Sequence, residues 1–391
     1  MRRLILSAGA LRFLDSAVLI LPFYTVMFAE HGLSPAQIGV ILAAWSVTGV
    51  VLEAPSGVLA DRVSRRWLLA TAQAVRCLGF GVWLAFPGFW GFLVGLMLWG
   101  LKSATLSGAF EAVIYDELKA LGREADYARV IGRTQSARFA GVMTAALGAA
   151  PLAAFGYPTL IWISIGTGLA AAVSALALPE APRAVTVGRF DYVTHLRRGV
   201  MEAASLPGVP GLLAFIASMQ AVVWAVADYW QIFGQQVGLP KSGIALFMAA
   251  LSGVGAITAA LAHRLRGLRP VTFCMLYALA GACVVAGAAT WRTWSIVLPM
   301  AYVALYWTVD INADARFQHA LRSETRATVA SLKGFIMQCG TSLLMLAFGL
   351  IAQAASYRAA FLASGLTAMA IGGGFAVSTL RRPGTRRERG R

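Results

Sequence analysis

One short stretch of the sequence decides the fold, and it reads Gly57-Val58-Leu59-Ala60-Asp61-Arg62-Val63-Ser64-Arg65-Arg66. An apolar segment that begins near Ala36 ends in this stretch, and another begins at Trp67. Gly57 suits a place where two helix ends approach closely. The Asp61 carboxylate can accept hydrogen bonds from helix N-terminal amides, and the arginines can meet last-turn carbonyls or lipid phosphates. The stretch predicts a tight charged turn between two membrane helices, and the simpler alternative is a plain basic loop.

The composition is that of a membrane protein. Hydrophobic residues make up 59% of the chain and charged residues 13%, whereas a soluble globular domain carries roughly 25% charge. Apolar runs of about 18 residues or more recur along the whole sequence, which predicts many membrane-spanning helices. The N-terminal Met1-Arg2-Arg3 leads into such a run without a small-residue cleavage site. We therefore interpret this run as the first membrane helix and not as a signal peptide.

Twelve spans are predicted, at about 5–29, 36–59, 67–86, 90–117, 131–154, 159–178, 211–236, 243–262, 271–289, 295–319, 327–353 and 359–380. The turns after the even-numbered spans, together with both ends of the chain, hold 25 of the 33 Lys and Arg residues. Because Lys and Arg are enriched in cytoplasmic loops, both termini are expected in the cytoplasm. The net charge of +16 is accordingly interpreted as a signal of membrane topology, and no nucleic-acid partner is expected.

The longest polar stretch divides the chain into two halves. We predict an N-terminal six-helix half at 1–178, a cytoplasmic linker at 179–210, a C-terminal six-helix half at 211–380 and a basic cytoplasmic tail at 381–391. In the linker, residues 191–204 could form an amphipathic helix on the inner leaflet, and a flexible connection is the alternative. The halves look related, because Gly32-Leu33-Ser34-Pro35 after the first span has a counterpart in Gly238-Leu239-Pro240-Lys241 after the seventh.

The stretch at 57–66 resembles the signature between helices 2 and 3 of the major facilitator superfamily, G-x-x-x-D-R-x-G-R-R. The matching positions are Gly57, Asp61, Arg62, Arg65 and Arg66, while Ser64 stands where the family usually has glycine. The resemblance implies an all-α polytopic membrane protein whose 12 transmembrane helices form two pseudo-symmetric six-helix halves. It also implies a transporter and not an enzyme. In the family the aspartate and arginine join a charge network with neighbouring helix ends that holds the outward-facing state closed on the inside. The resemblance therefore implies a role in conformational gating for the matching residues, and topology suggests Asp116 as the partner of Arg65.

Ionisable residues lie deep in the spans that would line the central cavity of such a transporter: Asp15, Lys102, Asp228 and Asp310. A charge in the hydrocarbon core costs at least ~2.5–3.5 kcal/mol, so each one needs a partner or a water-filled cavity. We predict a pair between Lys102 and Asp15, because a lysine desolvated beside a carboxylate makes a site whose proton occupancy can respond to substrate. Arg12 lies three residues before Asp15 and could instead form a self-neutralising structural pair with it.

Spans 7 and 10 also carry aromatic and amide side chains. The full set of candidates for substrate binding and proton coupling is Arg12, Asp15, Lys102, Trp224, Asp228, Gln231, Tyr306, Trp307 and Asp310. Aromatic faces beside a carboxylate suit lipophilic cations, through cation–π contacts and charge pairing. The alternative is that aromatic residues at helical spacing serve packing, which is true of most of them.

The source of energy is inferred from missing motifs. The sequence has no phosphate-binding loop and no catalytic or metal-binding motif, so we expect no cofactor and no metal. An ion gradient or the substrate's own gradient must then drive transport, and the protonatable Asp15 and Asp228 favour a proton gradient as the energy source. The fifth span, with Gly141, Gly148 and Pro151 as its packing residues, is similar to the glycine-rich helix 5 signature of exporters in the superfamily but has lost most of its glycines.

The preferred hypothesis is proton-coupled efflux, by antiport, of small amphipathic or drug-like compounds. A proton-coupled symporter that imports a sugar, an organic acid or another nutrient is the main alternative. A membrane-embedded enzyme or sensor is a third. The expected partners are a small-molecule substrate, protons and the lipid bilayer, and we expect a monomer that spans the plasma (inner) membrane many times.

Overall fold

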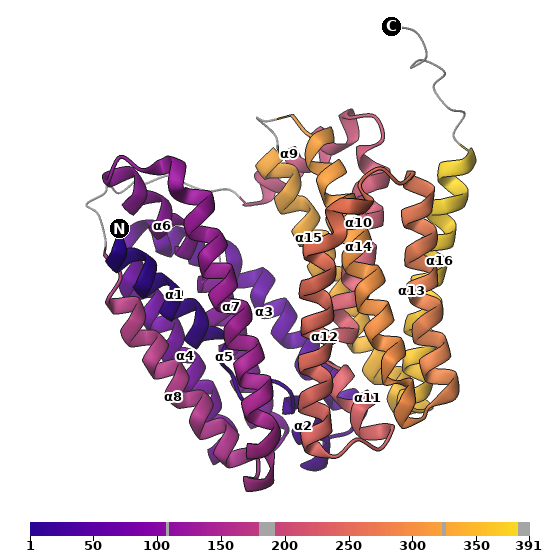
Figure 1. Cartoon of the computed structure of the whole chain (residues 1–391), viewed down its shortest axis with the longest axis horizontal. Helices are drawn as coiled ribbons and strands as arrows, with labels where there is room; N and C mark the ends of the chain where they lie inside the picture. Colours follow the sequence, from indigo (N-terminus) through magenta and orange to yellow (C-terminus); the bar gives the residue numbers. More distant parts are fainter. Residues whose placement is uncertain (107–108, 180–191, 323–325, 382–391) are drawn as a thin grey trace, which may run out of the picture.

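The computed structural model of the chain describes residues 1–106, 109–179, 192–322 and 326–381, and this part of the chain contains helices, turns and loops without a strand. Figure 1 shows two groups of helices side by side. The N-terminal group consists of α1 (Arg2–Ser16), α2 (Tyr24–Glu30), α3 (Pro35–Arg62), α4 (Arg65–Ala85), α5 (Phe89–Leu106), α6 (Ala109–Ala120), α7 (Tyr127–Leu152) and α8 (Tyr157–Leu176). The C-terminal group consists of α9 (Tyr192–Ser205), α10 (Val209–Ala227), α11 (Trp230–Gln236), α12 (Lys241–Leu261), α13 (Pro270–Thr290), α14 (Val297–Ala320), α15 (Arg326–Ala354) and α16 (Tyr357–Arg381).

The helices account for twelve membrane spans. In the described part of the chain, 11 helical stretches are long and apolar enough to cross a membrane. The first span is additional, because it is split into α1 and α2, each too short to cross alone. The start of α1 and the end of α16 lie at the same end of the molecule, the upper end in Figure 1, as an even number of spans requires. We call this the terminal end and the opposite one the distal end.

The first span is a broken helix, although the sequence predicted one continuous segment. Pro22 lies between α1 and α2, and proline has no N–H to donate and a fixed φ. Side chains of α8 satisfy backbone groups that the break leaves without helical partners. The Thr167 hydroxyl donates to the Ala17 carbonyl at 2.8 Å, and the Ser164 hydroxyl accepts from the Ile20 amide at 3.2 Å.

The seventh span, also predicted as continuous, breaks between α10 and α11, and the two breaks bond each other. Gln231 Nε2 donates to the Leu21 carbonyl at 2.9 Å, and Gln231 Oε1 accepts from the Thr25 amide at 3.1 Å. The Thr25 hydroxyl donates to the Asp228 carbonyl at 2.9 Å. Backbone groups in a bilayer must find their partners within the protein. Each half thus completes the hydrogen bonding of the other at these four residues, which we call the paired breaks.

The halves also pack directly, along α3 and α15. Gly39 and Gly349 let these helices approach so closely that a Cβ on Gly39 would stand 2.9 Å from the Gly349 Cα. Farther along the same helices, Gln338 Nε2 donates to the Ser46 hydroxyl at 2.8 Å. Small residues at such an interface allow close van der Waals packing, which drives helix association in membranes.

At the distal end, the halves are joined by an ion pair between Glu30 of α2 and Lys241 of α12, with an N–O distance of 2.8 Å. The Lys241 ammonium also lies 4.2 Å from the centre of the Tyr157 ring, at the start of α8. Among the described residues, the hydrogen bonds and ion pairs between the halves lie at the distal end or near the middle of the spans. Towards the terminal end the two groups of helices diverge (Figure 1).

Candidate functional site

A buried cluster of charges surrounds Asp15 in the last turn of α1. Lys102 of α5 forms an ion pair with the Asp15 carboxylate, and Gln73 Nε2 of α4 donates to Asp15 Oδ1 at 2.8 Å. Arg76 Nη1, one turn further along α4, lies 2.5 Å from the Asp15 carbonyl oxygen and 3.3 Å from Oδ1. All four side chains are buried, and Arg76 is 0% exposed. The predicted contact between Lys102 and Asp15 is present, and we call the four residues the Asp15 cluster.

The Asp15 cluster contains two cations and one carboxylate. Among the described residues, Nε and Nη2 of Arg76 and Oε1 of Gln73 have no hydrogen-bond partner. The guanidinium fits against α8 because position 168 is glycine, where a Cβ would stand 3.1 Å from Arg76 Nη2. A buried charge that loses its partner is strongly destabilising. The ionised Asp15 therefore limits the excess positive charge of the cluster to one, and protonation of Asp15 raises it to two.

Arg12 does not belong to the Asp15 cluster. Its guanidinium forms an ion pair with Glu111 of α6, with an N–O distance of 2.7 Å, and lies 4.1 Å from the centre of the Phe110 ring. The pair between Arg12 and Asp15 that the sequence left open is therefore not formed. Their spacing does place both on one helix face, but α6 brings a carboxylate to Arg12, while α4 and α5 bring cations to Asp15.

The carboxylates of the C-terminal half are held by neutral groups. Asp310 of α14 accepts a hydrogen bond from Gln220 Nε2 of α10 at 2.7 Å, and the Tyr306 hydroxyl lies beside its carboxylate. The carboxylate of Asp228, at the break of span 7, lies beside the hydroxyl of Tyr24 in the other half. Within the described part of the chain, neither aspartate forms an ion pair with a lysine or an arginine.

Most of the candidate aromatic and amide side chains are committed to packing. Tyr306 is 2% exposed, and Trp307 packs over Gly255, where a Cβ would stand 2.7 Å from its Nε1. Gln231 is buried, and its amide bonds the paired breaks on both sides. Trp224, in contrast, is 46% exposed. The packing alternative therefore describes Tyr306 and Trp307 better than a substrate-lining role does, and the amide of Gln231 serves the contact between the halves.

The charged stretch at 57–66 is mostly helical. Because α3 continues to Arg62, position 57 lies inside a helix, and the tight turn that the sequence predicted around it begins only at Val63. The surroundings of Gly57 and the side chain of Asp61 lie outside the described part of the structure. The predicted roles of these two residues therefore stay predictions.

At the end of this stretch, Arg65 in the first turn of α4 forms an ion pair with Asp116 of α6. This is the partner that topology suggested. Arg62 is exposed and Arg66 is half-buried. The contact between Arg65 and Asp116 joins α4 and α6 at the terminal end. It therefore stabilises the packing of the N-terminal half where the two halves diverge.

The three candidate packing residues of the fifth span differ in how closely other helices pack against them. A Cβ on Gly141 of α7 would stand 2.2 Å from the Phe13 carbonyl oxygen, so this glycine is required for the close approach of α7 to α1. Nothing lies within 4 Å of the corresponding point on Gly148, so close packing does not explain that glycine. Pro151 is exposed near the end of α7.

The sequence analysis missed several residues that the structure brings to the site. Gln73 and Arg76 form one side of the Asp15 cluster, and Thr25 completes the paired breaks. A signal for the first two was available, because a glutamine and an arginine three residues apart in an apolar run lie on one helix face. No comparable signal marks Thr25, whose partners belong to a different half.

The comparison with known families agrees with this geometry. Residues 5–332 match the family described as the Major Facilitator Superfamily. The chain belongs to this family. The arrangement of twelve spans in two halves is that of a major facilitator, and so are the matching residues of the 57–66 signature. The predicted fold class is confirmed. The protein is a transporter and not an enzyme, as predicted.

Relatives of this major facilitator have been described. An uncharacterised MFS-type transporter of Mycobacterium tuberculosis (strain ATCC 25618 / H37Rv) is 30% identical over 183 residues, which is 46% of this chain and 40% of that protein. Among solved structures, the nucleoside transporter NupG superposes with a TM-score of 0.79 at 13% identity, over 97% of this chain and 99% of NupG. A bacterial homologue of the human lysosomal transporter Spinster, in an inward-facing and occupied conformation, superposes with a TM-score of 0.76 at 16% identity, over 97% of this chain and 96% of that one.

These likenesses establish the fold of a secondary transporter. The match to the curated relative covers less than half of either chain, and the solved structures are too distant in sequence to indicate a substrate. Known transporters with this fold carry small molecules, and this major facilitator is a multi-pass membrane protein.

Proposed function

We propose that this protein is a proton-coupled secondary transporter that exports small amphipathic compounds in exchange for protons. The observation that carries the proposal is the Asp15 cluster, in which one carboxylate neutralises part of the charge of two buried cations. A proton on Asp15 would leave Lys102 and Arg76 without a counter-charge, which is unfavourable away from water. Proton binding would thereby favour a rearrangement of α1, α4 and α5, the helices that hold the cluster.

The proposed proton site lies close to the contact that closes the halves. Asp15 precedes the last residue of α1, and the paired breaks begin at Leu21, six residues later. Arg76 also holds the backbone carbonyl of Asp15, so movement of the guanidinium would pull on the end of α1. Broken helices at corresponding positions of two repeats are where transporters bind and gate. A change of charge at Asp15 would then alter the hydrogen bonds between Leu21, Thr25 and Gln231.

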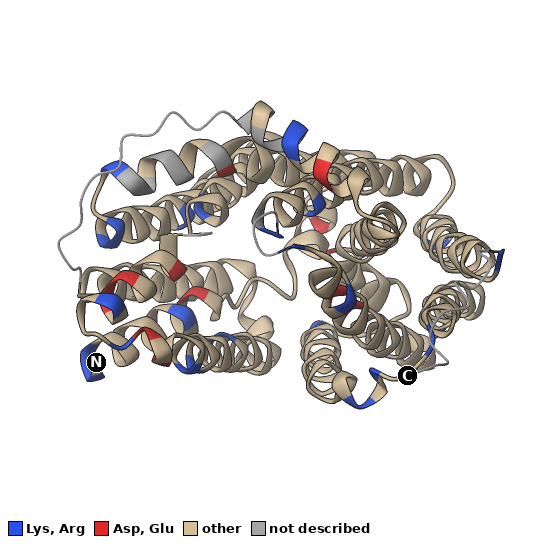
Figure 2. Cartoon of the chain, turned by 90° about the horizontal axis from the view of Figure 1, so that it is seen from above, with Lys and Arg blue, Asp and Glu red and all other residues tan. Residues whose placement is uncertain are grey.

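The orientation in the membrane follows from the distribution of charge. Figure 2 views the molecule from the terminal end, where lysines and arginines of many helices gather. Loops rich in Lys and Arg remain in the cytoplasm, so we assign the terminal end, and both chain termini, to the cytoplasmic side of the cell membrane. The bonds between the halves then close the outer side, and the transporter in this conformation faces inward, ready to take up a substrate for export.

The geometry also bears on the substrate. The Asp15 cluster carries excess positive charge, which favours neutral or anionic amphipathic compounds beside it. In the part of the chain that the structure describes, Asp228 and Asp310 form no ion pair with a lysine or an arginine, so these two carboxylates still suit the lipophilic cations that the sequence suggested. The exposed ring of Trp224 offers a face on which an apolar part of the substrate can stack. The energy source would be the proton gradient alone, without a cofactor, and the unit of function a monomer.

Symport of a nutrient is the second candidate. A buried carboxylate that exchanges a proton can serve either direction of coupling, so the Asp15 cluster supports proton coupling without fixing its direction. The loss of glycines in span 5 weakens the likeness to the helix 5 signature of exporters, and this observation favours the alternative.

The test uses purified protein in liposomes that contain a pH-sensitive dye. Neutral, anionic and cationic amphipathic compounds, sugars and organic acids would be added with and without an imposed proton gradient. Substrate-dependent proton movement opposite to the substrate supports export by antiport, whereas movement in the same direction supports symport. Substrate flux without proton movement would refute the coupling role of Asp15, and equal proton movement by the Asp15→Asn variant would refute it too.

A further inference from the structure

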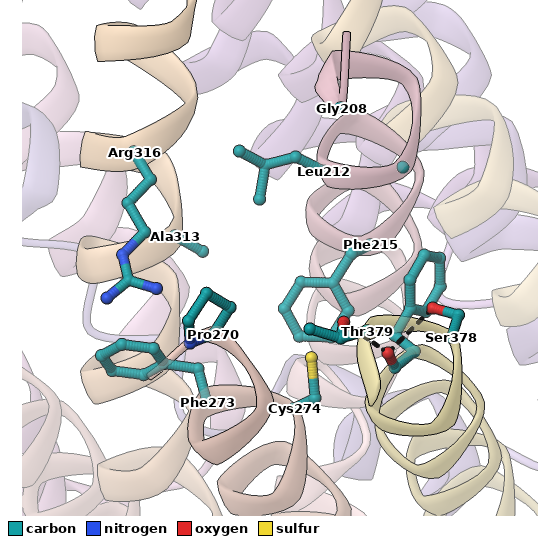
Figure 3. Close-up of a pocket in the computed structure, with 12 residues that line it drawn as sticks. Gly208, Leu212, Phe215, Pro270, Phe273, Cys274, Ala313, Arg316, Ser378 and Thr379 are labelled. Atoms are coloured by element: carbon teal, nitrogen blue, oxygen red, sulfur yellow. Dashed lines mark hydrogen bonds between the residues drawn. The ribbon is translucent and has the colours of Figure 1, made fainter. Parts of the chain in front are cut away.

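A cavity of about 300 Å³ lies inside the C-terminal half, between α10, α13, α14 and α16 (Figure 3). Its walls are mainly apolar, and Leu212, Phe215, Phe273 and Phe375 supply the larger side chains. This volume lies at the lower limit of typical ligand pockets, which are also lined predominantly by hydrophobic groups. All lining residues belong to one half, so the cavity is separate from the space between the halves and from the Asp15 cluster.

The depth of the cavity in the membrane is set by the helix ends around it. Its lining begins at Gly208, immediately before α10, and at Pro270, the first residue of α13. On the other two helices the lining residues lie within about two turns of the ends at Ala320 and Arg381. These are the terminal ends of all four helices. The cavity therefore lies where the hydrocarbon core meets the lipid headgroups of one leaflet.

One charged residue, Arg316 of α14, belongs to the lining, and Figure 3 shows its side chain reaching down toward Pro270 and Phe273. Its Nη2 donates to the Leu268 carbonyl at 2.5 Å, and its guanidinium lies 4.7 Å from the centre of the Phe273 ring. These contacts fix the guanidinium beside the apolar walls. No acidic residue lines the cavity, and in the described part of the chain no carboxylate forms an ion pair with Arg316.

The surroundings of the cavity add to this positive charge. Arg264, Arg266 and Arg269 precede α13 and are exposed, and Arg381 is exposed at the end of α16. A cationic rim above an apolar slot between membrane helices has the form expected of a site for an anionic lipid, in which phosphate meets arginine and an acyl chain meets apolar side chains.

We propose that this cavity binds an anionic phospholipid of the leaflet at the terminal end, with the phosphate at Arg316 and one acyl chain between α10, α13 and α16. A free phosphate would gain nothing from the apolar walls, and a neutral hydrocarbon would gain nothing from the guanidinium. Because α10 ends immediately before Asp228 and α14 carries Asp310, a bound lipid stabilises the packing of two helices that position these carboxylates. The site does not depend on the proposed direction or coupling of transport.

The test measures the thermal unfolding of the full-length protein in a neutral detergent by tryptophan fluorescence, as lipid is added. The probes are phosphatidylglycerol, phosphatidylcholine with the same acyl chains, and inorganic phosphate alone. We expect phosphatidylglycerol to raise the unfolding midpoint, and the other two probes to leave it nearly unchanged. Arg316→Gln should weaken the apparent affinity for phosphatidylglycerol by about tenfold or more, as loss of a charge-assisted contact predicts, and Arg316→Lys should restore part of it.

Two further variants keep the test decisive. Arg292→Gln removes the same charge at the distal end, next to α13, and should retain the full response to phosphatidylglycerol. Leu212→Trp fills the cavity without changing charge and should abolish the response, so the proposal can be tested even if Arg316→Gln does not fold. An equal response to phosphatidylglycerol and phosphatidylcholine, or a full response of Leu212→Trp, would overturn the proposal. A response to inorganic phosphate alone would show an anion site in place of a lipid site.

Discussion

The two halves of the molecule treat their buried carboxylates in opposite ways. In the N-terminal half, Asp15 lies between Lys102 and Arg76, and its negative charge is needed by both. In the C-terminal half, the carboxylate of Asp310 accepts a hydrogen bond from the amide of Gln220, and among the described residues neither Asp310 nor Asp228 forms an ion pair with a lysine or an arginine. A carboxylate held by neutral groups can gain or lose a proton without isolating another charge. The comparison teaches that two halves with related folds can differ in how their buried carboxylates are used. Compensation of buried cations by a carboxylate occurs at Asp15 in the N-terminal half and not at Asp228 or Asp310.

The largest effect is expected from Asp15→Asn. The variant leaves two buried cations without a carboxylate, and breaking a buried ion pair from one side costs roughly 3–5 kcal/mol. We expect a strongly lowered thermal unfolding midpoint and loss of substrate-dependent proton movement in liposomes. The double variant Asp15→Asn with Lys102→Met removes one of the isolated cations and should recover part of the stability without recovering proton movement. Equal stability of the single and double variants would argue against charge compensation as the role of Asp15.

A smaller effect is expected from Gln231→Leu, which removes the amide that joins the halves at the paired breaks. Loss of its hydrogen bonds to Leu21 and Thr25 should cost roughly 2–3 kcal/mol, because the buried backbone groups lose their partners. The population should shift away from the conformation with a closed distal end. Spin labels at Phe155 and Trp294, both exposed at that end, would report longer distances. Gln236→Leu, at an exposed position in the same helix, is the control and should leave the distances unchanged.

Asp310→Asn sharpens the contrast between the halves. The asparagine keeps a carbonyl oxygen for the amide of Gln220, and no cation loses its partner, so the cost should be about 1 kcal/mol. We expect nearly normal proton movement per substrate, measured with the liposome assay. A loss of proton coupling as complete as that of Asp15→Asn would contradict the division between the halves.

The smallest effect is expected at the terminal end, from Asp116→Asn. The carboxylate of Asp116 is 37% exposed in its ion pair with Arg65, and partly exposed pairs contribute roughly 0.2–1 kcal/mol. Transport rate should change by a few fold while substrate affinity stays the same, because the pair stabilises the terminal end of one half and not a binding surface. Arg129→Gln, an exposed charge at the start of α7, serves as the control. A large change in substrate affinity would show that Asp116 acts on the binding site instead.

The contact between Lys102 and Asp15 could be predicted although the two residues are distant in sequence. Each charge lies deep in an apolar span, and a buried charge needs a partner, so few combinations were possible. The topology of twelve spans could also be predicted, because it depends on the length of each apolar run and on which turns carry Lys and Arg. The Gly57 stretch identified the family, although the helix extends through the position where a turn was expected.

The partners of Arg12 and Gln231 could not be predicted, since they depend on how helices distant in sequence come together. Arg12 and Asp15 share a helix face, yet α6 places Glu111 beside the first and α5 places Lys102 beside the second. The break of span 1 had a signal in Pro22. The break of span 7 contains no proline or glycine, and it is completed by Thr25 from the other half.

The paired breaks have a consequence for how the chain is made. During synthesis the first span enters the bilayer long before the seventh. The carbonyl of Leu21 and the amide of Thr25 therefore form their hydrogen bonds to the side chain of Gln231 only after the seventh span has been made. Until then, the kink of the first span has no partner from the second half, and a nascent chain could hold this span in more than one arrangement. The final shape of the earliest segment to be inserted is thus decided by residues translated about two hundred codons later, which makes the two halves interdependent in assembly as well as in transport.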